Sequence, residues 1–325
     1  MITRRTCLTG LAGALLLSAA PTIVGAQERR RVTLRLNWTP NAEHAPYYLG
    51  LKNGFYAEAG IDLQILPGSG SANAVKLVGA GNDMFGVALA DSVVIGRGRE
   101  VPVTSAGVML QQTPNVVASM AAKGIVEPKD LDGKRFGVEA RSSSGAIFAA
   151  FAQAVQLDVS KVQQVELGTT AGATALISNI IDACIILATN EKVAMEAEGE
   201  RLNIIDVARY GVKVYGQCLF TSDALAARDP ALVAAMRDAT FRSWEYCRDN
   251  IDKAIAVLKE NVPETDTAIE TAKWREIAPR TKPVDGNAPL GTQTVKGWTS
   301  TYETFARAKL IDRAYDPAEL IAKLS

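Results

Sequence analysis

The sequence predicts an α/β protein of two lobes joined by two crossing segments of chain, and three observations lead to this. Beyond an apolar N-terminal stretch, short β-rich runs alternate with helical patterns, as in βαβ units. From Pro230 onward the pattern is helical only. No internal repeat or low-complexity linker divides the chain, so two lobes would be joined through extended segments of their own.

Strands and helices are expected in three groups. In the N-terminal part we expect strands at 32–36, 61–65, 85–89 and 101–108, and a helix over 45–58. In the middle part we expect strands at 116–118, 136–138 and 180–187, and helices over 145–155 and 191–198. In the C-terminal part we expect helices over 231–248, 251–260, 267–277 and 292–308. Strands separated by helices of this length favour mostly parallel sheets covered on both faces.

The two best candidates for the crossings are Gln111–Asn115 and Lys213–Gln217, which are extended and flank a self-contained β/α stretch. They divide the chain into an N-terminal segment, a first lobe in two parts and a second lobe. The limits are 1–26 for the N-terminal segment, 27–112 and 218–325 for the first lobe, and 113–217 for the second lobe.

Residues 1–26 have the features of an export signal. Arg4 and Arg5 precede a short leucine-rich stretch that ends in the small residues Val24-Gly25-Ala26. The stretch is too short and too broken by glycine and proline to span a membrane comfortably. The adjacent arginines favour the twin-arginine route, although ordinary secretory signals often carry two arginines. We therefore expect cleavage after Ala26 and a periplasmic protein.

The composition is that of a folded chain without a charge bias. Of its 325 residues, 48% are hydrophobic and 22% are charged. The 35 basic residues balance the 35 acidic ones and no long basic run occurs, which disfavours a nucleic-acid binder. The chain has a single histidine, His44, and no metal-ligand spacing occurs among Cys184, Cys218 and Cys247. Both observations disfavour a metal site or a catalytic triad. We expect at least Cys184 and Cys218 to be buried, and the spacing leaves a disulfide open.

Candidate site residues follow the ends of expected strands, because ligands of open α/β sheets bind there. Two exceptions are His44, at the start of a helix, and Tyr215, in the second crossing. The candidates are Asn37, Trp38, His44, Ser71, Asp91, Arg141, Ser143, Asn190, Glu191 and Tyr215.

Two candidates lie in one loop after the first strand. Trp38 is suited to stack on a flat heterocycle, and the alternative is that it fills the core. His44 either contacts ligand or holds the loop through hydrogen bonds. We see no carboxylate or cysteine partner for His44, which disfavours a general base.

The other first-lobe candidates follow later strands. Ser71 lies in a Gly/Ser loop (67–73) whose free N–H groups would favour a phosphate, sulfonate or carbonyl oxygen, unless the loop is only a flexible connection. Asp91 is either a ligand contact or a helix N-cap.

In the second lobe, Arg141 would hold an anionic tail and Ser143 a polar edge, or both lie on a solvated loop. Glu191, beside Asn190, would accept hydrogen bonds from an exocyclic amino group, although a glutamate at a helix start is also favoured by the helix dipole. Tyr215 would cover the other face of the ring.

Two sequence blocks resemble the thiamine-pyrimidine-precursor binding family. Residues 37–46 (N-W-T-P-N-A-E-H-A-P) carry the specific part, N-W-x-P-N-x-x-H, whereas residues 54–63 (G-F-Y-A-E-A-G-I-D-L) are shared with binders of sulfonates and other anions. Residues 131–138, 181–183 and 190–193 match as well. The family includes periplasmic solute-binding proteins of ABC importers and a eukaryotic pyrimidine synthase. The resemblance implies a type II periplasmic-binding-protein fold with ligand in the cleft between the lobes.

The synthase branch of that family implies residues that this chain does not carry. The branch needs a lysine shortly after a G-x-G-x-x-D-x-G stretch, to bind pyridoxal phosphate, and a histidine a few residues later. Here residues 79–86 form the comparable stretch, and Ala88 and Ser92 follow it. The branch's cysteine-rich run is also absent, with Gly211–Tyr215 in its place. The resemblance therefore implies a protein that is not an enzyme and carries no cofactor or metal.

The resemblance implies a monomeric solute-binding component of an ABC importer, with a membrane permease as partner. Its ligand is expected to be a small aromatic heterocycle, foremost a thiamine pyrimidine precursor. Riboflavin-like compounds, sulfonates and aromatic carboxylates remain alternative ligands, because the cleft of such a fold changes by loop substitution. A sensory or scaffolding role at a membrane receptor is a further alternative, and a pyrimidine synthase is the least favoured.

Overall fold

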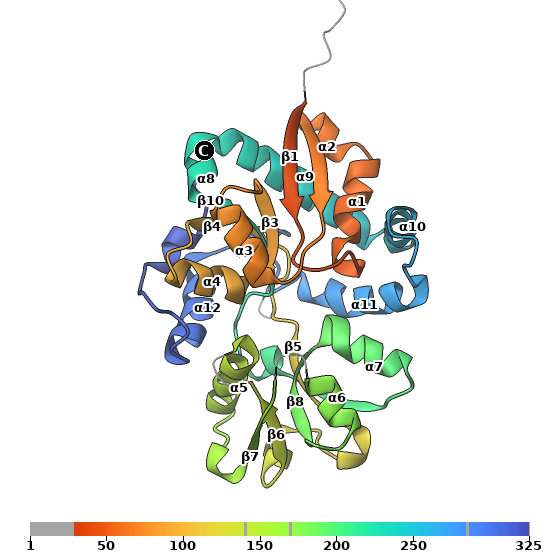
Figure 1. Cartoon of the computed structure of the whole chain (residues 1–325), viewed down its shortest axis with the longest axis vertical. Helices are drawn as coiled ribbons and strands as arrows, with labels where there is room; N and C mark the ends of the chain where they lie inside the picture. Colours follow the sequence, from red (N-terminus) through yellow and green to blue (C-terminus); the bar gives the residue numbers. More distant parts are fainter. Residues whose placement is uncertain (1–28, 140–141, 169–170, 284–285, 325) are drawn as a thin grey trace, which may run out of the picture.

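The computed structural model describes residues 29–139, 142–168, 171–283 and 286–324 (Figure 1). The expected export signal and the candidate Arg141 lie outside the described residues. Within these ranges, no helix combines the length and the apolar character needed to cross a membrane.

Two five-stranded sheets form the two halves of an elongated molecule (Figure 1). The first has the order β2-β1-β3-β10-β4, from β1 (Arg30–Arg35), β2 (Ile61–Leu66), β3 (Phe85–Leu89), β4 (Val103–Val108) and β10 (Gln217–Ser222). The second has the order β7-β6-β8-β5-β9, from β5 (Asn115–Met120), β6 (Arg135–Val138), β7 (Gln163–Glu166), β8 (Ala183–Leu187) and β9 (Leu202–Asp206).

Both sheets are mixed: four strands of each run in the same direction, as expected, and one strand, β10 or β5, runs against them. In the first sheet β1 pairs parallel with β2 and β3, whereas β10 pairs antiparallel with β3 and β4. The second sheet repeats this arrangement, with β6 parallel to β7 and β8, and β5 antiparallel to β8 and β9. The reason is that β5 and β10 each receive the chain from the other sheet. They therefore run away from the junction, whereas their neighbours run toward it.

The chain passes between the sheets twice, from β4 to β5 and from β9 to β10. These passages support the division into a first lobe (27–112 and 218–325) and a second lobe (113–217). The exact limits of the two lobes stay a prediction. In Figure 1, α11 lies along the junction of the two halves.

Helices cover both sheets. Those of the first lobe are α1 (Ala45–Lys52), α2 (Phe55–Glu58), α3 (Ser71–Gly79), α4 (Ala90–Gly98), α8 (Asp223–Arg228), α9 (Pro230–Arg248), α10 (Ile251–Asn261), α11 (Thr267–Arg280) and α12 (Val295–Arg307). Those of the second lobe are α5 (Ser143–Ala154), α6 (Gly172–Ile177) and α7 (Val193–Ala197). The short 3₁₀ turns are η1 (Ala42–His44), η2 (Ala121–Lys123), η3 (Pro128–Leu131), η4 (Val159–Lys161), η6 (Val207–Tyr210) and η7 (Pro317–Leu320), and η5 (Ala188–Lys192) is a π-helical turn.

Two expected helices differ from the structure. The helix expected over 45–58 is two helices, because Gly54 adopts a left-handed φ of 78° that ends the first. The helix expected over 191–198 is the end of the π-helical turn η5 followed by the short α7.

Neighbouring side chains of β3 point to opposite faces of the first sheet and enter two different cores. Val87 packs in the cluster that contains Trp244 of α9, and Ala88 packs in the cluster that contains Trp298 of α12. Both tryptophans are fully buried. The three cysteines within the described residues are buried and free, so the expected burial of Cys184 and Cys218 is confirmed.

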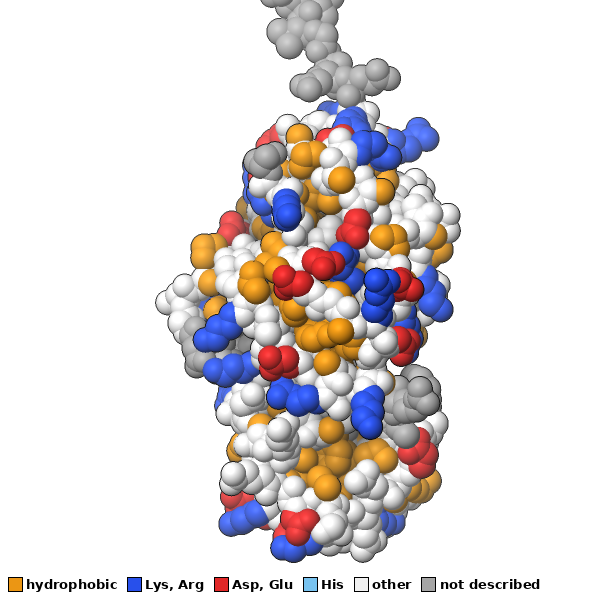
Figure 2. Space-filling model, turned by 90° about the vertical axis from the view of Figure 1, so that its left-hand side faces the viewer, with side chains coloured by type: hydrophobic (Ala, Val, Ile, Leu, Met, Phe, Trp, Pro, Cys, Tyr) orange, Lys and Arg blue, Asp and Glu red, His pale blue; other side chains and the backbone are white. Residues whose placement is uncertain are grey.

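The surface drawn in Figure 2 carries acidic and basic side chains interspersed over both halves of the molecule. No extended basic area appears on that face among the residues described. This mixed surface agrees with the balanced charge of the sequence.

Candidate ligand-binding site

The polar residues of the N-W-x-P-N-x-x-H block bond one another in the loop after β1. Asn41 Oδ1 accepts a hydrogen bond from Glu43 N at 3.0 Å, and His44 Nδ1 accepts from Asn41 N at 3.2 Å. Asn37 joins the same network, since its Oδ1 lies 2.7 Å from His44 Nε2 and its Nδ2 donates to Glu43 Oε1 at 2.9 Å. The specific part of the motif therefore fixes its own backbone.

His44 is fully buried, and both of its ring nitrogens bond within the loop. These bonds assign the proton to Nε2, because Nδ1 accepts from a backbone N–H. Burial lowers the pKa of His44 to about 3, so the ring is neutral. Its Nε2 also lies 3.5 Å from Glu43 Oε1, so the expectation that His44 has no carboxylate neighbour was wrong. In this structure His44 holds the loop, which is one of the two roles left open by the sequence.

Trp38 is exposed on the loop that this network fixes. Its side chain is 48% exposed, so it does not fill the core. The Gly/Ser loop after β2 holds the backbone on either side of this ring. Gly68 N donates to Trp38 O at 3.0 Å, and Gly70 N donates to Asn37 O at 2.7 Å. A Cβ at Gly68 would lie 1.9 Å from Leu36 O, so only glycine permits this approach.

The Gly/Ser loop thus uses polar groups that the sequence offered for an anion. The N–H groups of Gly68 and Gly70 bond the loop after β1, and Ser71 Oγ accepts from Leu89 N at 3.1 Å. These bonds tie together the ends of β1, β2 and β3. They leave fewer donors for a phosphate or sulfonate than the sequence suggested.

Three carboxylates and one lysine gather where the loop after β1 meets α11 and η5. Lys273 Nζ donates to Glu270 Oε1 at 2.8 Å, and Glu270 Oε2 accepts from Ala42 N at 2.5 Å. Glu43 interacts electrostatically with Lys273, Glu270 and Glu191. We call Glu43, Glu191, Glu270 and Lys273 the carboxylate cluster.

Burial controls the charges of two members of this cluster. It raises the pKa of Glu43, which Asn37 and Lys273 partly oppose, and it raises the pKa of Glu191. Glu43 belongs to the first lobe and Glu191 to the second, so the cluster spans the junction. Glu43 is not among the site residues predicted from the sequence, although it lies inside the specific motif.

Glu191 lies in the π-helical turn η5 that follows β8. Its Oε2 accepts a hydrogen bond from Leu187 N at 3.1 Å, and η5 packs against α11 of the first lobe. Asn190, beside it, is partly buried. Single π-helical turns occur frequently at functional sites. The turn thus places the second-lobe carboxylate opposite the loop that carries Trp38.

Asp91 and Ser143 connect the lobes on the other side of the junction. Asp91 is the second residue of α4 and does not cap it. Its carboxylate accepts hydrogen bonds from Ser92 Oγ at 3.0 Å and from Ser143 Oγ, at the start of α5. Burial raises the pKa of Asp91. This contact therefore joins the helix that follows β3 in the first lobe to the helix that follows β6 in the second.

Tyr215 is engaged by α12. Its ring meets Trp298 edge-on, with centroids 5.3 Å apart, and its hydroxyl accepts from Thr294 N at 3.1 Å. Tyr215 therefore has a structural contact of its own, separate from the proposed stacking on a ligand.

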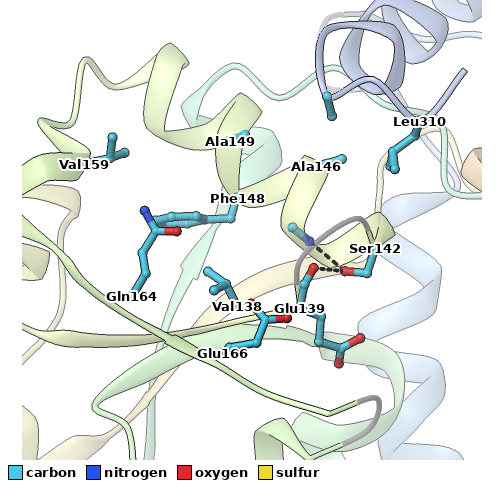
Figure 3. A pocket seen from close by; sticks show the side chains of 12 residues that line it. Val138, Glu139, Ser142, Ala146, Phe148, Ala149, Val159, Gln164, Glu166 and Leu310 are labelled. Atoms are coloured by element: carbon cyan, nitrogen blue, oxygen red, sulfur yellow. Dashed lines mark hydrogen bonds between the residues drawn. The ribbon is translucent and has the colours of Figure 1, made fainter.

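A separate pocket of about 350 Å³ lies between the edge of the second sheet and α5 (Figure 3). Glu139 and Glu166, at the ends of β6 and β7, line it together with Phe148 of α5 and Leu310 of the first lobe. Figure 3 shows Ser142 at one end, where its Oγ donates to Glu139 O at 2.7 Å. Among the described residues, none of the sequence-derived candidates lines this pocket. The candidates lie in separate places instead: Asp91 and Ser143 bond each other, Glu191 interacts with Glu43 of the Trp38 loop, and Tyr215 packs on Trp298.

A metal does not explain the carboxylate cluster. The described ranges contain no group of three or more His, Cys, Asp or Glu side chains arranged to hold a metal ion.

Comparison with known proteins identifies the family. Residues 41–254 match the NMT1/THI5-like family. The chain belongs to this family.

Its relatives include both binding proteins and enzymes. The formylaminopyrimidine-binding protein of Halalkalibacterium halodurans is 25% identical, over 82% of this chain and 82% of the relative. The 4-amino-5-hydroxymethyl-2-methylpyrimidine phosphate synthase of Legionella pneumophila is 26% identical, over 89% and 90%. The riboflavin-binding protein RibY of Chloroflexus aurantiacus is 27% identical, over 92% and 88%.

A solved structure confirms the fold. The periplasmic aliphatic sulphonate binding protein SsuA from Escherichia coli superposes with a TM-score of 0.73 at 13% identity, over 90% of this chain and 97% of that chain. The expected fold of two α/β lobes joined by two crossings, the periplasmic-binding-protein fold, is therefore confirmed.

Proposed function

We propose that this NMT1/THI5-like protein is an extracytoplasmic solute-binding protein that delivers a small aromatic heterocycle, foremost a thiamine pyrimidine precursor, to an ABC importer. The observation that carries the proposal is the exposed indole of Trp38 on a fixed loop whose own Glu43 faces Glu191 of the other lobe. The ring of the ligand stacks on Trp38, and its polar edge bonds carboxylates from both lobes.

The charges of the cluster favour a ligand that donates hydrogen bonds. Glu43, Glu191 and Glu270 all interact with the cation Lys273, which already bonds Glu270. A sulfonate or carboxylate ligand would add negative charge to a region with a carboxylate excess. The amino group and ring N–H of an aminopyrimidine are donors, which carboxylates accept. A relative that is named for formylaminopyrimidine binding agrees with this choice.

The residues at the positions that the synthase uses support binding rather than synthesis. Ala88 is fully buried in β3, and Ser92 Oγ donates to Asp91. Neither side chain is able to form an aldimine or donate an imidazole. We therefore propose a protein that carries its ligand unchanged, although some relatives are named as synthases.

The proposed location of the mature protein is the periplasm. Residues 1–26 would direct the protein to the periplasm through the twin-arginine route and be removed there. The mature protein would act as a monomer, with a membrane permease as its partner. These points rest on the sequence and on the fold shared with periplasmic proteins.

A thermal-shift panel tests the ligand class. The mature protein is heated with 4-amino-5-hydroxymethyl-2-methylpyrimidine, its formylamino analogue, riboflavin or an alkanesulfonate. A ligand that binds only the folded state at about 100 times its Kd stabilises it by about 2.7 kcal/mol, which raises Tm by several degrees. We expect this rise with the aminopyrimidines. A rise with the sulfonate alone would contradict the proposal.

A further inference from the structure

Gln217 is a fully buried glutamine whose side chain bonds nothing among the described residues. Its side chain is 0% exposed, and neither Oε1 nor Nε2 has a hydrogen-bond partner there. Its backbone carbonyl, by contrast, accepts from Met109 N at 2.8 Å and from Leu110 N at 3.1 Å. A buried donor or acceptor without a partner destabilises the folded state. Both polar atoms of this amide are therefore buried at a cost in stability.

Gln217 lies where the first sheet ends at the junction of the lobes. It is the first residue of β10, directly after the second crossing, and it pairs with Leu89, the last residue of β3. The carbonyl of Gly216 accepts from Ala90 N at 2.6 Å, and Asp91 follows Ala90. Gln217 is therefore a neighbour of the strand-end residues that border the proposed site.

The face of the sheet follows from strand alternation. Gln217 shares a face with Leu219, because side chains two residues apart in a strand point the same way. Leu219 packs in the hydrophobic cluster that contains Leu36 and Tyr47. Leu36 immediately precedes Asn37 and Trp38. The amide of Gln217 therefore lies on the face of the sheet to which the Trp38 loop is attached.

We propose that Gln217 is a specificity-determining residue that bonds the ring edge of the ligand when the heterocycle stacks on Trp38. A carboxamide presents an acceptor and a donor side by side. It matches a ring nitrogen next to an exocyclic amino group, which is one edge of an aminopyrimidine. A sulfonate offers only acceptors and would leave Oε1 unpaired. This inference rests on the proposed function and narrows its ligand to a heterocycle with adjacent donor and acceptor atoms.

An internal water is the competing explanation. Tyr47 Oη and Trp244 Nε1, in the same cluster, also lack partners among the described residues. A water bonded to these groups and to Gln217 would satisfy all of them without a ligand. The two explanations predict different changes in the stability of the ligand-free protein when the amide is removed.

The experiment compares two leucine substitutions in the full mature protein. Gln217→Leu removes an amide without partners, whereas the control Gln293→Leu removes one that is bonded at both ends. Gln293 Nε2 donates to Ser105 O at 3.0 Å, and its Oε1 accepts from Trp298 Nε1 at 3.0 Å. Gln217→Met provides a second apolar variant of similar length, in case leucine disturbs folding.

For the Gln217 variants we expect an equal or higher Tm of the empty protein and an affinity for the aminopyrimidine that is about tenfold weaker or more. The Gln293→Leu control should lower Tm and keep the affinity. The proposal is overturned if Gln217→Leu and Gln217→Met lower Tm as Gln293→Leu does and bind the ligand as the wild type does. Failure of the wild-type protein to bind any aminopyrimidine would instead overturn the proposed function, and with it this role of Gln217.

Discussion

Trp38 combines an exposed ring with a fixed backbone, which is what stacking on a ligand requires. Removal of a stacking aromatic costs about 1–3 kcal/mol in nucleic-acid binding, or about tenfold to a hundredfold in affinity. We expect Trp38→Ala to weaken binding of the aminopyrimidine by this amount. The Tm of the empty protein should stay near that of the wild type, because the indole is already 48% exposed.

Titration calorimetry of the variant measures this loss, with Tyr246→Ala as its control. Tyr246 is also an exposed aromatic (37%), but it packs on Phe55 of α2, away from the proposed site. The control should bind ligand as the wild type does. If Trp38→Ala kept its affinity and lost several degrees of Tm, the ring would be structural.

His44 should give the folded protein a specific dependence on pH. Its pKa is lowered to about 3 by burial, whereas an unfolded histidine titrates near 6.5. As pH falls below about 6.5, the unfolded chain therefore takes up a proton first, and the free energy of unfolding falls until about pH 3. The loss is about 1.4 kcal/mol per pH unit, or about 2 kcal/mol at pH 5.

The contribution of His44 is isolated by comparison with His44→Gln, which keeps polar atoms but does not titrate. Glu43, Glu191 and Asp91 act in the opposite direction, because their raised pKa values make the folded state take up protons first as the pH falls. They are present in both proteins. We expect the difference in unfolding free energy to change by about 2 kcal/mol between pH 7 and 5 in urea denaturation. Parallel pH profiles would show that His44 is not held neutral.

The sequence predicts residues that lie beside each other in the chain better than residues that meet through packing. Trp38 and Glu191 are recognisable because each follows a strand end. Lys273 lies on α11, more than two hundred residues after Glu43, and only the packing of α11 on η1 brings them together. The side chain of Gln217 is buried without a hydrogen-bond partner because several elements pack around it. The residues next to it in the sequence therefore do not reveal this.

The loop after β1 and the loop after β2 act as one unit. The loop after β1 has hydrogen bonds of its own, whereas the Gly/Ser loop after β2 would be a flexible connection without this contact. Backbone bonds from Gly68 and Gly70 join them, and the absence of a Cβ at Gly68 allows the contact. The position of Trp38 is therefore set by backbone groups of another loop, and substitution at Gly68 would displace it.

Strand pairing shows which parts of the fold the sequence determines locally. Buried strands such as β3 have continuous apolar runs and are found where expected. The strand β7 (Q-Q-V-E) is short, polar and at a sheet edge, so it has no apolar pattern to recognise. The antiparallel pairing of β5 and β10 follows from the two passages of the chain between the sheets, which is a property of the whole topology.

Contacts on both sides of the junction hold the two lobes together. Ser143 bonds Asp91 on one side, and Lys192 Nζ bonds Glu276 Oε1 at 2.8 Å on the other. A ligand that touches Trp38 and Glu191 binds this arrangement better than one with parted lobes, so it shifts the population toward it. Any change that weakens these contacts reduces affinity by reducing the fraction of competent molecules.

The substitution Ser143→Ala tests this coupling, because it removes one hydrogen bond to a carboxylate across the junction. Such a bond contributes about 1.5–3 kcal/mol, so we expect the apparent affinity to fall by about tenfold or more. Small-angle X-ray scattering should also show a larger radius of gyration for the ligand-free variant than for the wild type. Saturating ligand should restore the radius of gyration of the wild type, because ligand binding stabilises the compact arrangement of the lobes.

Ser160→Ala is the matched control for Ser143→Ala. Ser160 Oγ donates to Asp158 Oδ1 at 2.6 Å, which is a serine–aspartate bond within the second lobe alone. Its loss should leave both the radius of gyration and the affinity unchanged. If Ser143→Ala weakened binding without enlarging the ligand-free molecule, Ser143 would act by touching the ligand, and closure would not depend on its bond to Asp91. The scattering measurement thus separates a residue that contacts ligand from one that holds the two lobes in the arrangement that ligand recognises.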